Sequence, residues 1–338
     1  MKKVIFGLTI IALLIVIFVS NSVAQEEKLV WDESWPTRIR IGTGTIGGGA
    51  YMGGSAIANV LKAEFPQLEV IVEQTKSSVQ NVFLLENNEI EIGACSLDCD
   101  YDALTAKEGT EFEGQDMTDF RTFMPRGPAP ILFVTLKKNN INNVKEFTGR
   151  YSAGSYGSAL SVFIPKTFKV FGNDVEVINL PTSDAVQALR NGSISGFSLG
   201  HPNTAVVEMG MTTDILVLGI TGEDAEKFLE AHPEYVYPLT VPAGYYEGQD
   251  EELQIAGLQL TFNVRDDLPE EMVYTMLKAW HKHQDIVKDT WPALLESEGT
   301  QPDYMKSIAN VAPIHEGALK YYTEMGAKFN EDACSLNK

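Results

Sequence analysis

A short alternation of apolar and polar residues at positions 39–41 runs directly into a glycine-rich stretch at residues 42–51. The residues after it, 54–62, place apolar side chains at the spacing of a helix. This order predicts a strand, a flexible turn and the N-terminus of a helix. Small residues leave backbone N–H groups uncovered, and the helix adds the positive end of its dipole, so the turn is suited to hold an anion.

The same glycines admit two other interpretations. Gly42, Gly44 and Gly47 match the Gly-x-Gly-x-x-Gly pattern of dinucleotide-binding loops, which also requires an acidic residue about 20 positions further on, at the end of a second strand. The next predicted strand, residues 70–72, is flanked by glutamates but runs into a second polar turn at residues 74–78. Two polar turns equally suit a small ligand, and a plain connecting turn that needs positive φ angles is the third interpretation.

The chain begins with Lys2 and Lys3, an apolar run over residues 4–19, and small residues up to Ala24. This pattern is typical of a secretory signal peptide, because a basic start and a short apolar core precede a small-x-small cleavage site. The run is short for a membrane span, and an uncleaved anchor is the alternative. We therefore expect residues 1–24 to be removed near Ala24 and the mature chain to work in the periplasm.

The exported chain is strongly acidic. The formal net charge of the full sequence is −20, and the loss of Lys2 and Lys3 makes it −22. Such a charge opposes binding to nucleic acid or to an anionic membrane surface. An anionic ligand must therefore be held by local donors, namely backbone N–H groups, hydroxyls or an arginine. The remaining length of about 310 residues predicts two domains rather than one core.

No constellation for catalysis or metal binding stands out in the sequence. It contains no Gly-x-Ser-x-Gly elbow, no Walker loop and no paired zinc ligands, so we predict no catalytic residue, no cofactor and no metal. His201 and His315 lack an ordered catalytic partner and are interpreted as structural. Cys95 and Cys99, four residues apart, form either a short disulfide or two free thiols at a strand end.

The order of predicted strands and helices indicates an α/β protein. Strands at residues 39–41, 70–72 and 90–94 alternate with helices, which favours a mainly parallel sheet with ligands at the carboxyl ends of its strands. A proline cluster at residues 125–130 then separates two strands and suggests a crossing between domains. In the second domain, residues 152–159 repeat a strand end that turns into a helix start, and two such loops can close on a ligand from opposite sides.

Four stretches carry a family likeness. They are Ile41-Gly42-Thr43-Gly44 with Gly47-Gly48 and Tyr51, then Ser78-Val79-Gln80-Asn81, then Val241-Pro242-Ala243-Gly244-Tyr245-Tyr246-Glu247-Gly248-Gln249-Asp250, and finally Ile314-His315-Glu316-Gly317-Ala318-Leu319-Lys320-Tyr321-Tyr322. In this order they resemble the TAXI group of extracytoplasmic solute receptors, which serve TRAP-type secondary transporters. The resemblance spans residues 38–326, nearly the whole exported chain.

The resemblance implies a type II periplasmic-binding-protein fold, an α/β fold of two lobes joined by a hinge with the ligand between them. Lobe I would comprise residues 38–128 and 240–330, and lobe II residues 129–239. The resemblance further implies a receptor that captures a small carboxylate, similar to glutamate or 2-oxoglutarate, and delivers it to the permease subunits of a TRAP-type transporter. We expect a monomer. A ligand-sensing subunit for a membrane sensor and a dinucleotide-binding enzyme are the alternatives.

We predict that small and polar groups of both lobes hold this small organic anion when the lobes close. Tyr51 either contacts the ligand or packs beneath its helix, and Arg126 either grips a carboxylate or is a solvated hinge residue. The predicted ligand-binding residues are Thr45, Gly47, Gly48, Tyr51, Ser78 and Asn81 in the first lobe, Arg126 at the hinge, and Ser155, Ser158 and Asn203 in the second lobe.

Overall fold

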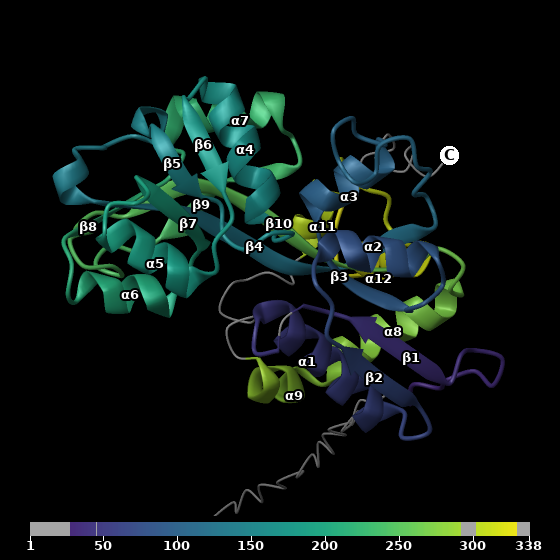
Figure 1. The fold of residues 1–338 in the computed structure, drawn as a ribbon. Coiled ribbons are helices and arrows are strands. Elements are labelled where there is room, and N and C mark those ends of the chain that lie inside the picture. The colour runs from purple at the N-terminus through teal and green to yellow at the C-terminus, as the bar shows by residue number, and fades with distance from the viewer. Residues whose placement is uncertain (1–27, 45, 292–301, 330–338) are drawn as a thin grey trace, which may run out of the picture.

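The computed structural model describes residues 28–44, 46–291 and 302–329. The predicted signal peptide and Thr45 of the predicted site lie outside these residues. The described chain forms two α/β bodies, which we call the first and the second lobe, and two long strands join them (Figure 1). In the described segments, no helix is long and apolar enough to cross a membrane.

The first lobe is built on a sheet with the strand order β2-β1-β3-β10-β4. β1 pairs in parallel with both β2 and β3, as expected for strands that alternate with helices. β10 and β4 then extend the sheet in the antiparallel direction. These strands are β1 (Arg38–Gly42), β2 (Glu69–Glu73), β3 (Ile92–Ser96), β4 (Phe120–Leu136) and β10 (Leu253–Arg265). The predicted parallel arrangement of the first three strands is confirmed.

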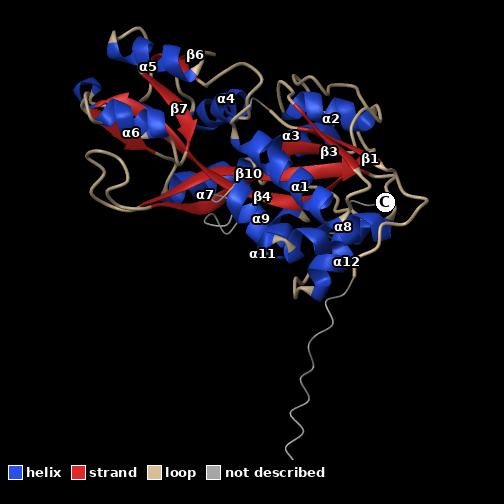
Figure 2. Cartoon of the chain, turned by 90° about the horizontal axis from the view of Figure 1, so that it is seen from below, coloured by secondary structure: helices blue, strands red, loops and turns tan. Residues whose placement is uncertain are grey.

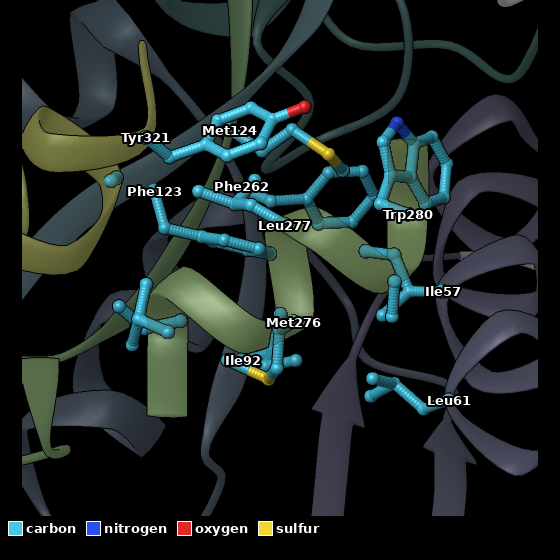
Figure 3. Close-up of a cluster of buried hydrophobic side chains, with 14 of the residues drawn as sticks. Ile57, Leu61, Ile92, Phe123, Met124, Phe262, Met276, Leu277, Trp280 and Tyr321 are labelled. Carbon is cyan, nitrogen blue, oxygen red and sulfur yellow. The ribbon is translucent and has the colours of Figure 1, made fainter. Parts of the chain in front are cut away.

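Helices cover both faces of this sheet. On one face, side chains such as Ile57, Phe262 and Trp280 form the largest hydrophobic cluster (Figure 3). On the other face, Leu85 and Phe120 belong to a smaller cluster. The helices of this lobe are α1 (Gly49–Glu64), α2 (Ser78–Glu86), α3 (Leu97–Leu104), α8 (Glu270–Lys282), α9 (Gln284–Thr290), α11 (Pro302–Ile308) and α12 (Glu316–Glu324). The large cluster draws on both ends of the described chain, as a first lobe that is discontinuous in sequence would require.

The second lobe repeats the parallel arrangement on a smaller scale. β5 pairs in parallel with β6 and β7, while β8 and β7 pair with β4 in the antiparallel direction. Aromatic side chains fill one of its two clusters, among them Phe133, Phe147 and Tyr151. Its elements are β5 (Gly149–Ser152), β6 (Val175–Ile178), β7 (Gly196–Gly200), β8 (Ile215–Leu218), β9 (Tyr235–Val241), α4 (Leu160–Phe171), α5 (Thr182–Arg190), α6 (Thr204–Gly210) and α7 (Gly222–Ala231), with 3-10 turns at Lys137–Asn139 and Val144–Glu146.

The connection between the lobes differs from the sequence prediction. We expected two separate strands on either side of the proline cluster, but β4 runs unbroken through residues 125–130. It pairs with β10 as far as Pro130 and with β7 from Ile131 onward. Proline is tolerated within strands at bulges, and the β4–β10 pairing contains such irregularities here. The crossing is therefore a continuous strand, and β10 crosses beside it (Figure 2).

Residues 240–258 were assigned to lobe I from the sequence. In the structure Val241, Tyr246 and Ile255 belong to a cluster of the second lobe, and β9 pairs with the first half of β10. Leu258 also packs in the second lobe. The lobe boundaries themselves stay a prediction, because β4 and β10 belong to both lobes. We propose that the chain returns to the first lobe along β10, after Leu258.

Candidate functional site

Loops from the two lobes meet at their junction. Gly157, in the loop after β5, approaches the loop after β2 so closely that a β-carbon on Gly157 would lie 3.6 Å from that of Ser77. Both loops follow the carboxyl end of a parallel strand and lead to a helix, which is where α/β proteins hold ligands. We give the name interlobe site to the residues of this region that are candidates for ligand binding: Gly47, Gly48, Ser78 and Arg126 with Ser152, Ser155 and Ser158.

Contacts connect the first-lobe part of this site step by step. Ser78 Oγ lies 3.5 Å from Ser96 Oγ, at the start of α3. The preceding residue, Cys95, accepts a hydrogen bond on its carbonyl oxygen from Nη2 of Arg126 at 3.3 Å. Nη1 of Arg126 lies 3.9 Å from the position that a β-carbon on Gly49 would occupy. The structure thus brings the predicted residues Ser78 and Arg126 to the same place as the start of α1.

Arg126 owes its position to a bulge in β4. Leu260 of β10 pairs with Gly127 and Thr261 pairs with Pro125, so Arg126 is the extra residue. Gly127 has a φ of +92°, a conformation that disfavours any residue with a side chain. Bulges of this kind redirect a side chain out of the regular strand alternation. The guanidinium is directed toward Cys95 and lies over the ring of Phe262, with 5.8 Å between Cζ and the ring centroid.

The electrostatic setting of Arg126 suits an anion. Among the described residues, no carboxylate lies within 4.0 Å of its guanidinium, and its buried Nε has no hydrogen-bond partner. Burial lowers the pKa of Arg126 to about 10, so the side chain is still charged at neutral pH. A half-buried cation without a counter-ion loses part of its hydration, and an anionic ligand would compensate for that loss. The side chain as a whole is half-buried, so the choice between a carboxylate contact and a solvated hinge arginine stays a prediction.

The start of α1 adds a second source of positive potential. Gly48 is the N-cap residue and has no side chain to cap the helix, while the first helical bond runs from Met52 N–H to the Gly48 carbonyl. The N–H groups of the first turn therefore lack acceptors within the helix, and Tyr51, partly buried, lies in this turn. Gly47 has a φ of +81°, so the predicted need for a positive φ is confirmed as well. The glycine-rich turn can therefore be both a connection that needs a positive φ angle and a site for an anion.

Asn81 has a structural task. Its Nδ2 donates to the carbonyl oxygens of Thr43 and Ala94, at 2.8 and 2.7 Å, and its side chain is fully buried. Gly42 must be a glycine here, since a β-carbon would lie 2.7 Å from Asn81 Oδ1. The first glycine of the dinucleotide-like pattern is therefore explained by packing inside the protein. The proposed ligand contact of Asn81 stays a prediction, but both of its N–H groups are already used.

The second lobe contributes serine hydroxyls. Ser158 Oγ is buried without a hydrogen-bond partner, and Ser155, which is exposed, accepts a bond from Ser158 N–H on its carbonyl. Ser152, the last residue of β5, also has a buried Oγ without a partner. Unpaired buried polar atoms in a native protein call for an explanation, and a bound ligand is one. Ser152 is not among the predicted ligand-binding residues, although it begins the predicted loop at residues 152–159 and its position at a strand end is a signal for such a role.

Asn203, the remaining predicted residue of the second lobe, lies at the start of α6. Its side chain caps α6 by accepting from Ala205 N–H, and its own N–H donates to Tyr246 Oη at 3.2 Å. The same hydroxyl lies 2.9 Å from His201 Nδ1. Burial lowers the pKa of His201 to about 4, so this histidine is neutral at physiological pH. Both side chains therefore serve the local structure, whereas a ligand contact by Asn203 stays a prediction.

Two further sequence interpretations can be compared with the structure. His315 caps α12 by accepting from Gly317 N–H on Nδ1, and its Nε2 bonds the Leu268 carbonyl, which agrees with its interpretation as structural. Cys95 and Cys99 are free and buried, and burial raises the pKa of both thiols. Of the two alternatives for this pair, the structure has free thiols. No group of three or more potential metal ligands occurs among the described residues.

A family model gives the decisive comparison. The model of the NMT1-like family matches residues 41–326, which include every element from β1 to α12 except the first three residues of β1. The chain belongs to the NMT1-like family. This match covers both lobes of the NMT1-like protein and all described residues of the interlobe site.

Solved structures show what fold this NMT1-like chain shares. MatC from Rhodopseudomonas palustris with bound malate has a TM-score of 0.52 at 12% sequence identity, and the match covers 90% of this chain and 100% of that chain. A TctC solute binding protein from Polaromonas, solved without ligand, has a TM-score of 0.50 at 17% identity, with 85% and 99% covered. The predicted fold class, the periplasmic-binding-protein fold, is confirmed.

Proposed function

We propose that this NMT1-like protein is an extracytoplasmic solute receptor that captures a small carboxylate between its lobes and delivers it to a membrane permease. The observation that carries the proposal is the position of Arg126, a half-buried arginine without a carboxylate partner among the described residues, beside the uncapped start of α1. A guanidinium and helix N–H groups that converge on one place form a site for a planar anion. Ser152 and Ser158 would bond the ligand from the second lobe.

Several observations support the finer parts of this proposal. The strongly acidic chain requires a local site for an anion, and MatC, which shares the fold, was solved with malate. The sequence resemblance to the TAXI group favours glutamate or 2-oxoglutarate as the solute and a TRAP-type permease as the partner. The amino-terminal pattern of Lys2, Lys3 and residues 4–24 favours export to the periplasm.

The proposal can be tested by thermal melting of the exported chain against a panel of anions. The panel contains glutamate, 2-oxoglutarate, malate, an alkyl sulfonate, phosphate and NAD. A carboxylate present at 100 times its dissociation constant should stabilise the folded state by about 2.7 kcal/mol and raise the Tm by several degrees. A shift with NAD alone would favour the dinucleotide-binding enzyme, and no shift with any carboxylate would contradict the proposal.

Variants of Arg126 connect the shift to the site. Arg126→Met should weaken binding of the carboxylate about 10- to 100-fold, because hydrogen bonds between charged groups contribute about 1.5–3 kcal/mol. The carboxylate affinity of Arg126→Lys should lie between those of wild type and Arg126→Met, since an ammonium group keeps the charge but cannot form the bidentate contact. Arg121→Met is the matched control, because Arg121 lies on the same strand and pairs with Asp266 at 3.1 Å. Equal affinities for Arg126→Met and Arg121→Met, measured by calorimetry, would place the anion elsewhere.

A further inference from the structure

A buried ion cluster lies beside the interlobe site. Lys166 Nζ donates to both carboxylate oxygens of Asp102 at 3.0 Å and to Glu234 Oε1 at 3.1 Å. The side chains of Lys166, Asp102 and Glu234 are only 14%, 3% and 1% exposed. His232 Nδ1 lies 3.1 Å from the same oxygen of Glu234. The cluster is therefore screened little by water and depends strongly on its geometry.

The partners of Lys166 belong to different lobes. Asp102 lies on α3, which is held on the first lobe by Asp100, whose carboxylate accepts bonds from Thr261 and Asn263 of β10 at 3.0 and 2.8 Å. Lys166 lies on α4, whose Phe163 and Phe168 pack in the aromatic cluster of the second lobe. α3 and α4 are neighbours across the junction in both views (Figures 1 and 2). The Lys166–Asp102 pair thus crosses from one lobe to the other.

The other bond of Lys166 stays within the second lobe. Glu234 directly precedes Tyr235, the first residue of β9, and Tyr235 packs in the same aromatic cluster as α4. Tyr235 makes a second cross-lobe bond, from its hydroxyl to Asp98 Oδ2 at 3.4 Å. Asp98 and Asp102 lie four residues apart and so share one face of α3. That face presents two acceptors to the second lobe.

We propose that the Lys166–Asp102 ion pair, with the Tyr235–Asp98 bond, is a latch that holds the two lobes in the closed arrangement and thereby sets ligand affinity. In the described arrangement the lobes touch at the junction, since a β-carbon on Gly157 would lie 3.6 Å from that of Ser77 and both cross-lobe bonds are formed. Rotation of the lobes about β4 and β10 would separate α3 from α4 and leave Asp102 without its cation. The inference rests on the proposed function only where it concerns affinity.

Lys166 would act at a distance from the bound solute. It lies six residues after the start of α4, which places it about 9 Å along the helix from the loop that carries Ser158. A group that favours one of two conformations changes the apparent affinity through the population of the binding-competent state. Loss of the latch should therefore raise the dissociation rate without removing a ligand contact.

Two conservative variants separate the cross-lobe bond from the bond within the lobe. Asp102→Asn removes the cross-lobe charge but leaves Lys166 paired with Glu234. Glu234→Gln is the matched control, because it removes a buried charge from the same cluster but keeps the cross-lobe pair. Spin labels on Lys62→Cys of α1 and Glu226→Cys of α7, both exposed, report the lobe separation by pulsed EPR without any ligand. Cys334 is replaced by serine, and Cys95 and Cys99 are buried.

Asp102→Asn should raise the population of molecules with the long label distance, relative to those with the short one, about tenfold, as expected for the loss of a charged hydrogen bond. Glu234→Gln should leave this population ratio near the wild-type value. The affinity for the carboxylate found in the melting panel should fall about threefold or more in Asp102→Asn only. Tyr235→Phe, which removes just one hydroxyl, should also raise the population with the long label distance, but less than Asp102→Asn does. This variant keeps the latch testable if Asp102→Asn does not fold. Unchanged distances in Tyr235→Phe and in every folded Asp102→Asn sample would overturn the latch. Because the distances are read without ligand, this outcome is separate from a failure of the carboxylate proposal.

Discussion

At the scale of single residues, the interlobe site depends on side chains that hold backbone in place as much as on those that face a ligand. Asn81 connects the loop after β1 to β3 through the carbonyls of Thr43 and Ala94. Thr75 Oγ1 adds a bond to the same Thr43 carbonyl at 2.8 Å. The turn that precedes α1 is therefore anchored from α2 and from the loop after β2. This anchoring fixes the start of α1 relative to Arg126.

We predict that Asn81→Ala destabilises the protein by about 2–4 kcal/mol. The variant leaves the Ala94 carbonyl without this donor in a fully buried place, weakens the support of Thr43, and creates a small cavity. Urea denaturation followed by fluorescence measures the effect. Asn59→Ala is the control, because the exposed bond from Asn59 to Thr290 should contribute within about 0.5 kcal/mol. Similar midpoints for the two variants would contradict the structural role of Asn81.

Residue types near the site were predictable from the sequence, whereas their surroundings were not. The glycine-rich turn and the hydroxyls after β5 followed from local patterns, because small residues and helix starts are neighbours along the chain. The burial of Arg126 depends on Gly49, Cys95 and Phe262, which are far from it in sequence. The bulge at Gly127 depends on the partner strand β10. No local pattern contains these contacts.

At the scale of elements, α3 is a helix with three buried carboxyl groups. Asp98 and Asp102 face the second lobe, while Asp100 points the other way and accepts from Thr261 and Asn263 of β10. The sequence pattern makes no prediction for these three aspartates, and acidic residues are seldom fully buried. Burial raises the pKa of Asp98 to about 6 and that of Asp100 to about 8. Asp100 is thus largely protonated at neutral pH.

We predict that Asp100→Asn reduces the loss of stability toward alkaline pH. The pKa of Asp100 is higher in the folded state than in the unfolded state, so the folded state binds more protons between about pH 4 and pH 8, and its stability falls as the pH rises through this range. An amide keeps one acceptor for Asn263 and donates to the Thr261 hydroxyl, without a charge. The Tm of the variant should exceed that of wild type by about 2–4 °C at pH 8 and match it within about 1 °C at pH 5.

Thermal melts across this pH range measure the difference. Asp250→Asn is the control, because Asp250 is exposed and the variant removes the same charge from the surface. Its Tm should follow that of wild type at both pH values. The pKa of Asp98 is also raised by burial, so part of the pH dependence of stability should remain in Asp100→Asn. A parallel pH profile for wild type and Asp100→Asn would show that the buried carboxyl is not the source.

At the scale of the whole molecule, the first lobe closes only when distant segments of the chain meet. Its large cluster combines Trp31 and Ile39, near the start of the described chain, with Tyr321 and Tyr322, near its end (Figure 3 shows part of it). The backbone adds a link, since Thr122 of β4 exchanges hydrogen bonds with Pro313 and His315. Among the described residues, the buried members of the second-lobe clusters all lie between positions 131 and 258. The stability of the first lobe therefore depends on the segment after residue 301, whereas the stability of the second lobe does not.

We predict that a stop codon after residue 301 unfolds the first lobe selectively. The truncation removes Met305, Ile308, Ala318 and Tyr322 from the large cluster, while no residue of the second-lobe clusters is lost. Hydrogen exchange read by mass spectrometry should show β1 to β3 exchanging rapidly and β5 to β7 still protected. A stop after residue 329 is the control and should protect both lobes. Equal protection of β1 and β5 in the shorter chain would refute the prediction.

Because the first lobe packs early and late segments of the chain together, it also determines the order in which the parts of a nascent chain can fold. Residues 38–104 leave the ribosome early, yet their packing partners in α8 and α12 are synthesised more than 150 residues later. A polypeptide whose earliest strands must wait for its final helices cannot finish folding while it is still being synthesised. For a chain that is exported, as we propose, this delay keeps residues 38–104 unfolded, and therefore able to pass through a translocation channel, until their later partners have followed.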